Sequence, residues 1–211
     1  MQRLVTFGCS LTYGEGLKDC WVPVNNIMRE GPEPSNYVWP KLVGDRLNLK
    51  LLNRGKSGAS NKFIWHQMLQ TNLNQEDTVV FLWTFHNRTC FFEHSDKHLR
   101  IMFQDIDNKE QSAERRQAAK FYFKHIYQEY DSVIEMWNKI NYSKLHLDKL
   151  NIKNHHFILD KNLEWPVPEW NNVDYIPINF NEHKYPLAVD NKHPGEDAQA
   201  VVADTIFNMI K

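Results

Sequence analysis

Several features that would direct a protein to a membrane, an export pathway or nucleic acid are missing from this chain of 211 residues. Residues 1–10 contain no long apolar stretch of the kind found in a signal peptide, and no later run is long enough to span a bilayer. Lys and Arg nearly balance Asp and Glu, which gives a formal net charge of −1, and they form no cluster that would follow nucleic-acid phosphates. We therefore expect a cytoplasmic protein that binds neither membranes nor nucleic acid.

Cysteine is also scarce. The three cysteines, Cys9, Cys20 and Cys90, show no CxxC pair and no regular spacing. Small secreted proteins that depend on disulfides, and proteins with structural zinc sites, need closely spaced cysteines. The sequence thus predicts neither a disulfide framework nor a metal site.

Apolar residues, by contrast, are sufficient to build a core, at 42% of the chain with 13% aromatic. Short apolar runs predict strands at residues 3–8, 50–53, 77–84, 156–159 and 173–178, and helical spacing predicts helices at residues 36–48, 63–73, 111–141 and 196–210. Residues 17–35 and 88–108 have no clear period and are predicted to be loops. The alternation of strands and helices favours an α/β fold with a parallel sheet that helices cover on both faces.

Polar residues follow the predicted strands directly. Ser10 comes after the first strand, Gly58 after the second and Asn87 after the third, and Asp190 and His193 precede the last helix. The carboxyl ends of parallel strands lie along one edge of the sheet, where ligands bind in α/β proteins. We therefore expect these five residues to gather at that edge.

These residue types suit acyl transfer, which needs a nucleophile, a base, a group that orients the base, and donors to the oxyanion. Ser10 would be the nucleophile, and an Asp190 carboxylate three residues before His193 can fold back onto the imidazole ring. Taken singly, each has a simpler interpretation. Ser10 could cap the following helix, and Asp190 could merely shape a turn that leaves His193 exposed.

Together the segments resemble the SGNH hydrolases, also called the GDSL esterase/lipase family. Four blocks, FGCSLTYG, NRGKSGASN, WTFHNR and DNKHP, occur in the order of the family's blocks. The resemblance implies that Ser10 is the nucleophile and that Asp190 and His193 complete a triad. It also implies an oxyanion hole formed by the backbone N–H groups of Ser10 and Gly58 and by the side chain of Asn87.

Two of the blocks depart from the family pattern. Cys9 stands where the family usually has Asp, and Asn87 lies between His86 and Arg88 instead of in Gly-x-Asn-Asp. Cys9 is expected to pack as a small buried residue, with a thiol nucleophile as the alternative. Thr12 stands where the α/β-hydrolase elbow G-x-S-x-G needs its second Gly, so that pattern is not met.

The resemblance implies one SGNH hydrolase-like domain over residues 1–211, with a loop-rich and helical excursion at about 88–150. It implies a three-layer α/β/α sandwich around a parallel sheet of about five strands. It implies a serine esterase that hydrolyses a short-chain acyl or acetyl ester and that needs no metal or organic cofactor. Two alternatives remain open: an acyltransferase with the same triad, and a catalytically silent binding or virion-associated protein.

The segment LEWPVPEWNNVDY contains two tryptophans, Trp165 and Trp170, among prolines. Exposed indole rings can stack on sugar faces, which would favour a carbohydrate ester as substrate. The alternative is that both rings cover an edge of the sheet.

Overall fold

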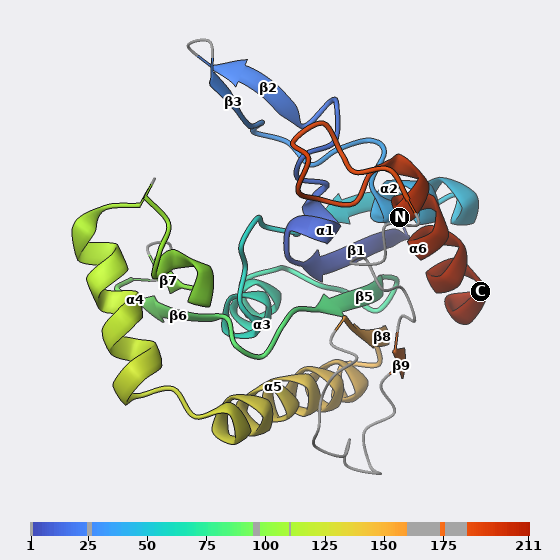
Figure 1. The fold of residues 1–211 in the computed structure, drawn as a ribbon. Coiled ribbons are helices and arrows are strands. Elements are labelled where there is room, and N and C mark those ends of the chain that lie inside the picture. Colours follow the sequence, from blue (N-terminus) through green and yellow to red (C-terminus); the bar gives the residue numbers. More distant parts are fainter. Residues whose placement is uncertain (1, 25–26, 95–97, 110, 160–173, 176–184) are drawn as a thin grey trace.

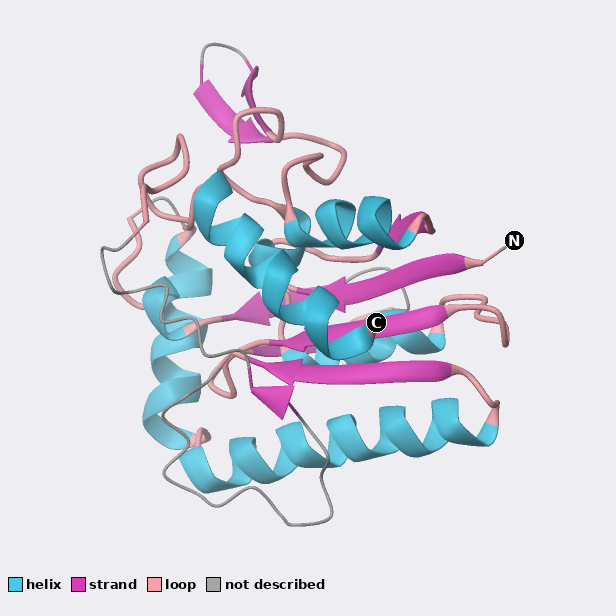
Figure 2. Ribbon diagram, turned by 90° about the vertical axis from the view of Figure 1, so that its right-hand side faces the viewer, coloured by secondary structure: helices cyan, strands magenta, loops and turns pink. Residues whose placement is uncertain are grey.

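The centre of the protein is a five-stranded parallel sheet with the strand order β4-β1-β5-β8-β9. The computed structural model describes residues 2–24, 27–94, 98–109, 111–159, 174–175 and 185–211. Figure 2 shows the long strands running in one direction, so that their carboxyl ends lie at one edge. The strands are β1 (Arg3–Gly8), β4 (Lys50–Asn53), β5 (Thr78–Trp83), β8 (Lys153–Ile158) and β9 (Asp174–Tyr175). The predicted parallel sheet of about five strands is confirmed.

Helices cover both faces of this sheet, as Figure 1 shows. One face carries α2 (Trp39–Leu47) and α6 (Glu196–Ile210), which pack against each other, and the other carries α3 (Asn61–Leu69) and α5 (Glu129–Lys149). The predicted three-layer α/β/α sandwich is confirmed. No helix in the described ranges is long and apolar enough to cross a membrane.

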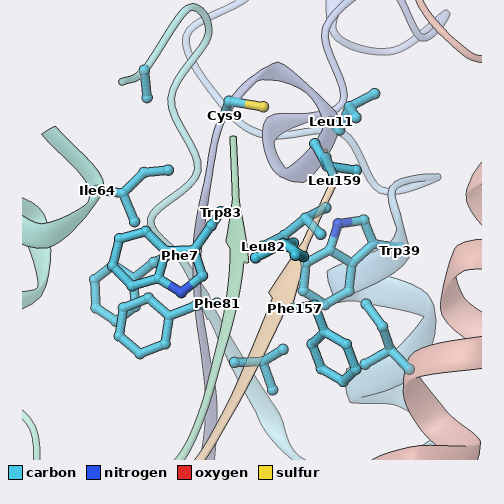
Figure 3. Packing of buried hydrophobic residues seen from close by; sticks show 14 of the residues in the cluster. Phe7, Cys9, Leu11, Trp39, Ile64, Phe81, Leu82, Trp83, Phe157 and Leu159 are labelled. Carbon is cyan, nitrogen blue, oxygen red and sulfur yellow. The ribbon is translucent and has the colours of Figure 1, made fainter. Parts of the chain in front are cut away.

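Aromatic rings from three neighbouring strands form the core on the α3 side. Phe7, Phe81 and His156 are register partners, and their ring centroids lie 5.0 and 4.6 Å apart. Burial lowers the pKa of His156 to about 3, so this ring packs as a neutral aromatic group. On the opposite side of the sheet, Trp39 and Phe157 fill the space beneath α2 and α6 (Figure 3).

The prediction of one long helix over residues 111–141 is wrong. The segment forms α4 (Ala113–His125) and then α5, and the backbone at Gln128 is extended, with φ −127° and ψ 125°. Ile126 donates its N–H to the carbonyl oxygen of Tyr122 and ends α4. The apolar spacing continues through the break, and residues 111–141 contain no Gly or Pro. Periodicity alone therefore does not reveal the break.

Two segments predicted to be loops contain β-hairpins. The first hairpin joins β2 (Trp21–Val24) to β3 (Ile27–Glu30), and the second joins β6 (Thr89–Phe92) to β7 (His98–Ile101), followed by the short helix η1 (Phe103–Asp105). Four-residue strands give little alternation to detect, and Pro23 inside β2 argues against a strand. Each pair forms its own two-stranded sheet outside the central one.

An ion pair between the partly exposed Arg3 and the buried Asp77 ties the start of β1 to the start of β5. Asp77 Oδ1 and Oδ2 accept hydrogen bonds from Arg3 Nε and Nη2 at 2.8 and 2.6 Å, and Oδ2 also accepts the N–H of Asn74 at 2.9 Å. Burial alone would raise the pKa of Asp77, but the Arg3 hydrogen bond, the Asn74 N–H and the charge of Arg3 outweigh it and hold the pKa below its ordinary value.

We expect Asp77→Ala to lower the free energy of unfolding by about 2 kcal/mol, because it leaves Arg3 Nε and the Asn74 N–H without their acceptor and Arg3 without its ion-pair partner. Urea denaturation at neutral pH measures this loss. The control is Asp45→Ala, which removes an exposed i,i+4 pair with Lys41 on α2 and should cost less than about 0.5 kcal/mol. Equal losses in the two variants would contradict the role of the buried pair.

Candidate active site

Ser10 is the first residue of α1 (Ser10–Tyr13), immediately beyond the carboxyl end of β1. The N-cap of this short helix is Cys9, and no side chain caps it, so the interpretation of Ser10 as a helix cap is wrong. The Ser10 side chain is mostly enclosed, with 5% of the residue exposed. Cys9 is 1% exposed and belongs to the hydrophobic core, which confirms its expected packing role.

The loop after β4 is held against the turn that begins with Ser10. Asn53 Nδ2 donates to the carbonyl oxygen of Thr12 at 2.7 Å, and Asn53 Oδ1 accepts the N–H of Gly55 at 2.8 Å. A Cβ added at Gly55 would lie 2.7 Å from the backbone N of Tyr13, which is too close for any larger residue. Asn53 and Gly55 therefore position the segment that leads to Gly58.

Gly58 has φ +66°, in the left-handed region that favours glycine. Arg100 of β7 lies directly against it: a Cβ at Gly58 would be 2.0 Å from Arg100 Nη1. Arg100 Nη1 also donates to the carbonyl oxygen of Ser57 at 2.7 Å. The predicted oxyanion residue thus has a cationic side chain beside it.

Asn87 lies in the turn that follows β5, and its side chain is exposed. The end of β5 is fixed by Asn61, the first residue of α3, whose side chain accepts the N–H of Thr84 at 2.8 Å and donates to its carbonyl oxygen at 2.9 Å. Of the residues flanking Asn87, His86 Nε2 lies 3.5 Å from Glu129 Oε1 of α5, and the Arg88 guanidinium lies over the ring of Phe85. Both departures from the family's third block therefore have local packing partners.

Asp190 and His193 form a hydrogen-bonded pair. His193 Nδ1 lies 2.6 Å from Asp190 Oδ2, and Asp190 Oδ1 accepts the backbone N–H groups of Lys192 and His193, each at 3.0 Å. Burial would raise the pKa of Asp190, but the hydrogen bonds from His193 and from the two backbone N–H groups hold it below its ordinary value. The carboxylate is therefore ionised at neutral pH and fixes the orientation of the imidazole.

This pair docks on the turn that begins with Ser10. Val189 donates its N–H to the carbonyl oxygen of Gly16 at 2.9 Å. Gly16 has φ +84°, and a Cβ there would lie 2.5 Å from Asp190 Cγ. The same turn is closed by the N–H groups of Gly14 and Glu15, which donate to the Ser10 carbonyl oxygen at 2.8 and 3.1 Å. The structure thus brings His193 to the turn that carries Ser10.

Glu15 is a site residue that the sequence interpretation missed. Its Oε2 accepts a hydrogen bond from Ser57 Oγ and lies 3.5 Å from His193 Nε2. Among the described residues, the Ser10 hydroxyl makes no hydrogen bond to His193. The sequence signal that could have pointed to Glu15 is its position, as a charged residue between Gly14 and Gly16 directly after the first block.

Trp165 and Trp170 lie outside the described residues. Within the described ranges, no group of three or more His, Cys, Asp or Glu side chains could hold a metal ion.

No protein-family model matches the sequence, and no curated protein matches it either. Solved structures, in contrast, are similar to the protein. An acetyl xylan esterase from the rumen bacterium Butyrivibrio proteoclasticus aligns with a TM-score of 0.57 and 12% identity, over 99% of this chain and 63% of that one. A catalytic mutant of an acetylxylan esterase from Geobacillus stearothermophilus aligns with a TM-score of 0.51 and 15% identity, over 99% and 93% of the two chains.

The chain has the SGNH-hydrolase fold. At these identities the likeness concerns the fold. In this SGNH-hydrolase fold, the segments of Ser10, Gly58 and Asn87 follow β1, β4 and β5, while Asp190 and His193 precede α6.

Proposed function

We propose that this protein is an esterase that uses Ser10 as nucleophile, His193 as base and Asp190 as the orienting carboxylate. One observation carries the proposal: the Asp190–His193 pair, joined at 2.6 Å, docks through Gly16 on the turn that begins with Ser10. The SGNH-hydrolase fold supports it, because this edge of an α/β sheet is where ligands bind.

In the proposed reaction, His193 Nε2 removes the proton from Ser10 Oγ as this oxygen attacks the ester carbonyl carbon. The resulting oxyanion is held by the N–H groups of Ser10 and Gly58 and by the Asn87 side chain, each worth about 100- to 1,000-fold in rate. His193 then protonates the departing alcohol. Water, activated by His193, attacks the acyl-enzyme and releases the acid, so the chemistry needs no added redox or metal group.

A short acyl group, and acetyl in particular, is the proposed acyl half. The two similar structures are acetyl xylan esterases by name, which supports an acetylated carbohydrate as the alcohol half. The single domain over residues 1–211, with its excursion at about 88–150, is part of the same proposal. Trp165 and Trp170 remain candidates for contact with a sugar face.

Labelling with a fluorophosphonate probe tests the nucleophile, because the probe modifies only an activated serine. We expect the wild-type protein to be labelled and Ser10→Ala to remain unlabelled. Ser60→Ala is the matched control: Ser60 is a buried serine that caps α3, and its variant should label like the wild type. Equal labelling of wild type and Ser10→Ala would contradict the assignment.

The alternatives give different results in one further assay. An acyltransferase would hydrolyse para-nitrophenyl acetate slowly in water. It would release para-nitrophenolate faster when a sugar alcohol is added as the acceptor. A catalytically silent binding or virion-associated protein would show neither labelling nor turnover.

A further inference from the structure

The helix α4 has little support from the rest of the described chain. It packs against β7 and η1 and lies at an outer end of the molecule, away from the central sheet (Figure 1). The structure describes all 13 residues of this helix, and Ala119 alone among them is buried. A helix of this length is marginal in water, and most helices owe their stability to packing one face against a neighbour. A further partner on the exposed face of α4 would therefore stabilise it.

An apolar groove runs along this helix. It has a volume of about 500 Å³ and lies between α4 and the β6–β7 hairpin. Phe121 is 58% exposed, and Phe91 and Leu99 are both nearly half exposed. Exposed apolar surface that gathers in one place, with aromatic rings at its centre, is typical of protein interaction sites. The apolar lining comes from the hairpin (Phe91, Leu99 and Ile101) and from the helix (Ala118, Phe121 and Tyr122).

The face of α4 opposite Ala119 carries opposite charges at its two ends. Residues three and four apart share a face of a helix, which places Glu114, Ala118, Phe121 and Lys124 along one stripe. Glu114 lies in the first turn and Lys124 in the last turn, and both are exposed. The stripe is therefore negative at its start, apolar in its middle and positive at its end.

The other cations of α4 do not change this pattern. Arg115 forms an ion pair with the buried Asp105 of η1 at 2.9 Å, and Arg116 donates a hydrogen bond to the carbonyl oxygen of Gln111. Both guanidinium groups are thus engaged within the chain. Lys120 lies at one edge of the stripe, about a quarter-turn of the helix from its middle.

A second copy of α4 complements the stripe when it runs antiparallel to the first. In the register that sets Phe121 beside the small Ala118 of the second copy, Glu114 lies next to the last turn of the second helix, which contains Lys124. Two-fold symmetry repeats this contact, so the opposite charges meet twice. A parallel pair would instead bring like charges together at both ends, which is unfavourable.

We propose that this face of α4 and the adjoining groove form the interface of a homodimer, in which two α4 helices pack antiparallel. Phe121 of each copy enters the groove of the other copy and covers the exposed side chains of Phe91 and Leu99. The dimer supplies the packing that α4 lacks in the single chain. The inference is independent of the proposed esterase function, because no residue that lines the groove belongs to the candidate active site.

Sedimentation velocity of the full chain measures the size of the particle in solution. We expect the wild type to sediment as a dimer of 25.1 kDa chains at micromolar concentration. Phe121→Ser should weaken dimerisation at least about tenfold, because it removes the largest exposed apolar group of α4 from the interface. The matched control is Leu145→Ser, which replaces a 68% exposed leucine on α5 and should leave the dimer unchanged. Circular dichroism should show the same helix content in both variants.

Reversal of the charges tests the antiparallel arrangement. Glu114→Lys and Lys124→Glu should each weaken dimerisation about tenfold or more, because each variant places like charges together twice. The double variant restores opposite charges and should dimerise within about threefold of the wild type. A loss of helix stability would not give this result, because unfavourable charges at the two ends of α4 would add their effects in the double variant.

Three results would overturn the proposal. The first is a wild type that stays monomeric throughout the micromolar range, and the second is a dimer that Phe121→Ser leaves intact. The third is a double charge variant that associates as weakly as the single variants. A monomer that instead sediments with phosphatidylcholine vesicles, and loses this binding in Phe121→Ser, would assign the groove to a lipid surface in place of a second copy.

Discussion

Replacement of His193 by alanine is expected to reduce hydrolysis of para-nitrophenyl acetate to the uncatalysed background. The imidazole is the group proposed to accept the Ser10 proton and to return it to the departing alcohol, so both half-reactions lose their proton carrier. Loss of such a histidine in a serine hydrolase costs about a million-fold in kcat. The measurement is the steady-state release of para-nitrophenolate by each variant.

Lys192→Ala provides the control for this loss. Lys192 is exposed in the same loop and gives its backbone N–H to Asp190, which the substitution keeps. Its activity should equal that of the wild type. A His193→Ala rate within about tenfold of wild type would remove His193 from the mechanism.

Asp190→Asn is expected to lower kcat by about 10,000-fold. An asparagine at this position keeps the shape but loses the negative charge. In the wild type, the Asp190 carboxylate accepts a hydrogen bond from His193 Nδ1 at 2.6 Å and stabilises the imidazolium. The neutral amide can present an N–H to the ring and select the wrong tautomer. Circular dichroism should show an intact fold, and Asp197→Asn, an exposed carboxylate in the first turn of α6, should retain activity.

The same variant has a pH-dependent effect on stability. The pKa of Asp190 is lowered in the folded protein, so its ionised form stabilises the fold above the unfolded-state pKa, and this contribution is lost as the pH falls through the folded-state pKa. The difference in unfolding free energy between wild type and Asp190→Asn should be largest at neutral pH and shrink in acid. A difference that grows in acid would contradict the hydrogen bonding described for Asp190.

The parts of the fold that could be predicted from the sequence are those with strong local signals. β1 and β4 are apolar runs that end at Gly8 and Asn53, and both were predicted with the observed bounds. The break before α5 and the two hairpins could not be predicted. The β6–β7 hairpin packs on α3 through the contacts of Phe63 with Phe92 and His98, and such contacts between distant segments leave no local signal. The break before α5 has no Gly or Pro to mark it.

The candidate site likewise contains residues that the sequence could predict and residues that it could not. Ser10, Asp190 and His193 stand beside recognisable turns, and the Asp190–His193 contact spans only three residues. Glu15 and Arg100 enter the site through Ser57, which lies about forty residues away from each along the chain. Contacts at that separation leave no periodic trace in a single sequence, so the contacts of these two residues with Ser57 are seen only in the folded structure.

The placement of Arg100 on a hairpin has a consequence for how this protein can diversify. The hairpin contributes no strand to the five-stranded sheet, and it is inserted between β5 and α4. Substitutions or length changes in β6 and β7 can therefore exchange the charged group beside Gly58 while the turn of Ser10 and the loop of His193 keep their supports. Relatives that differ in this hairpin are expected to keep the five-stranded sheet and to place a different side chain beside Gly58.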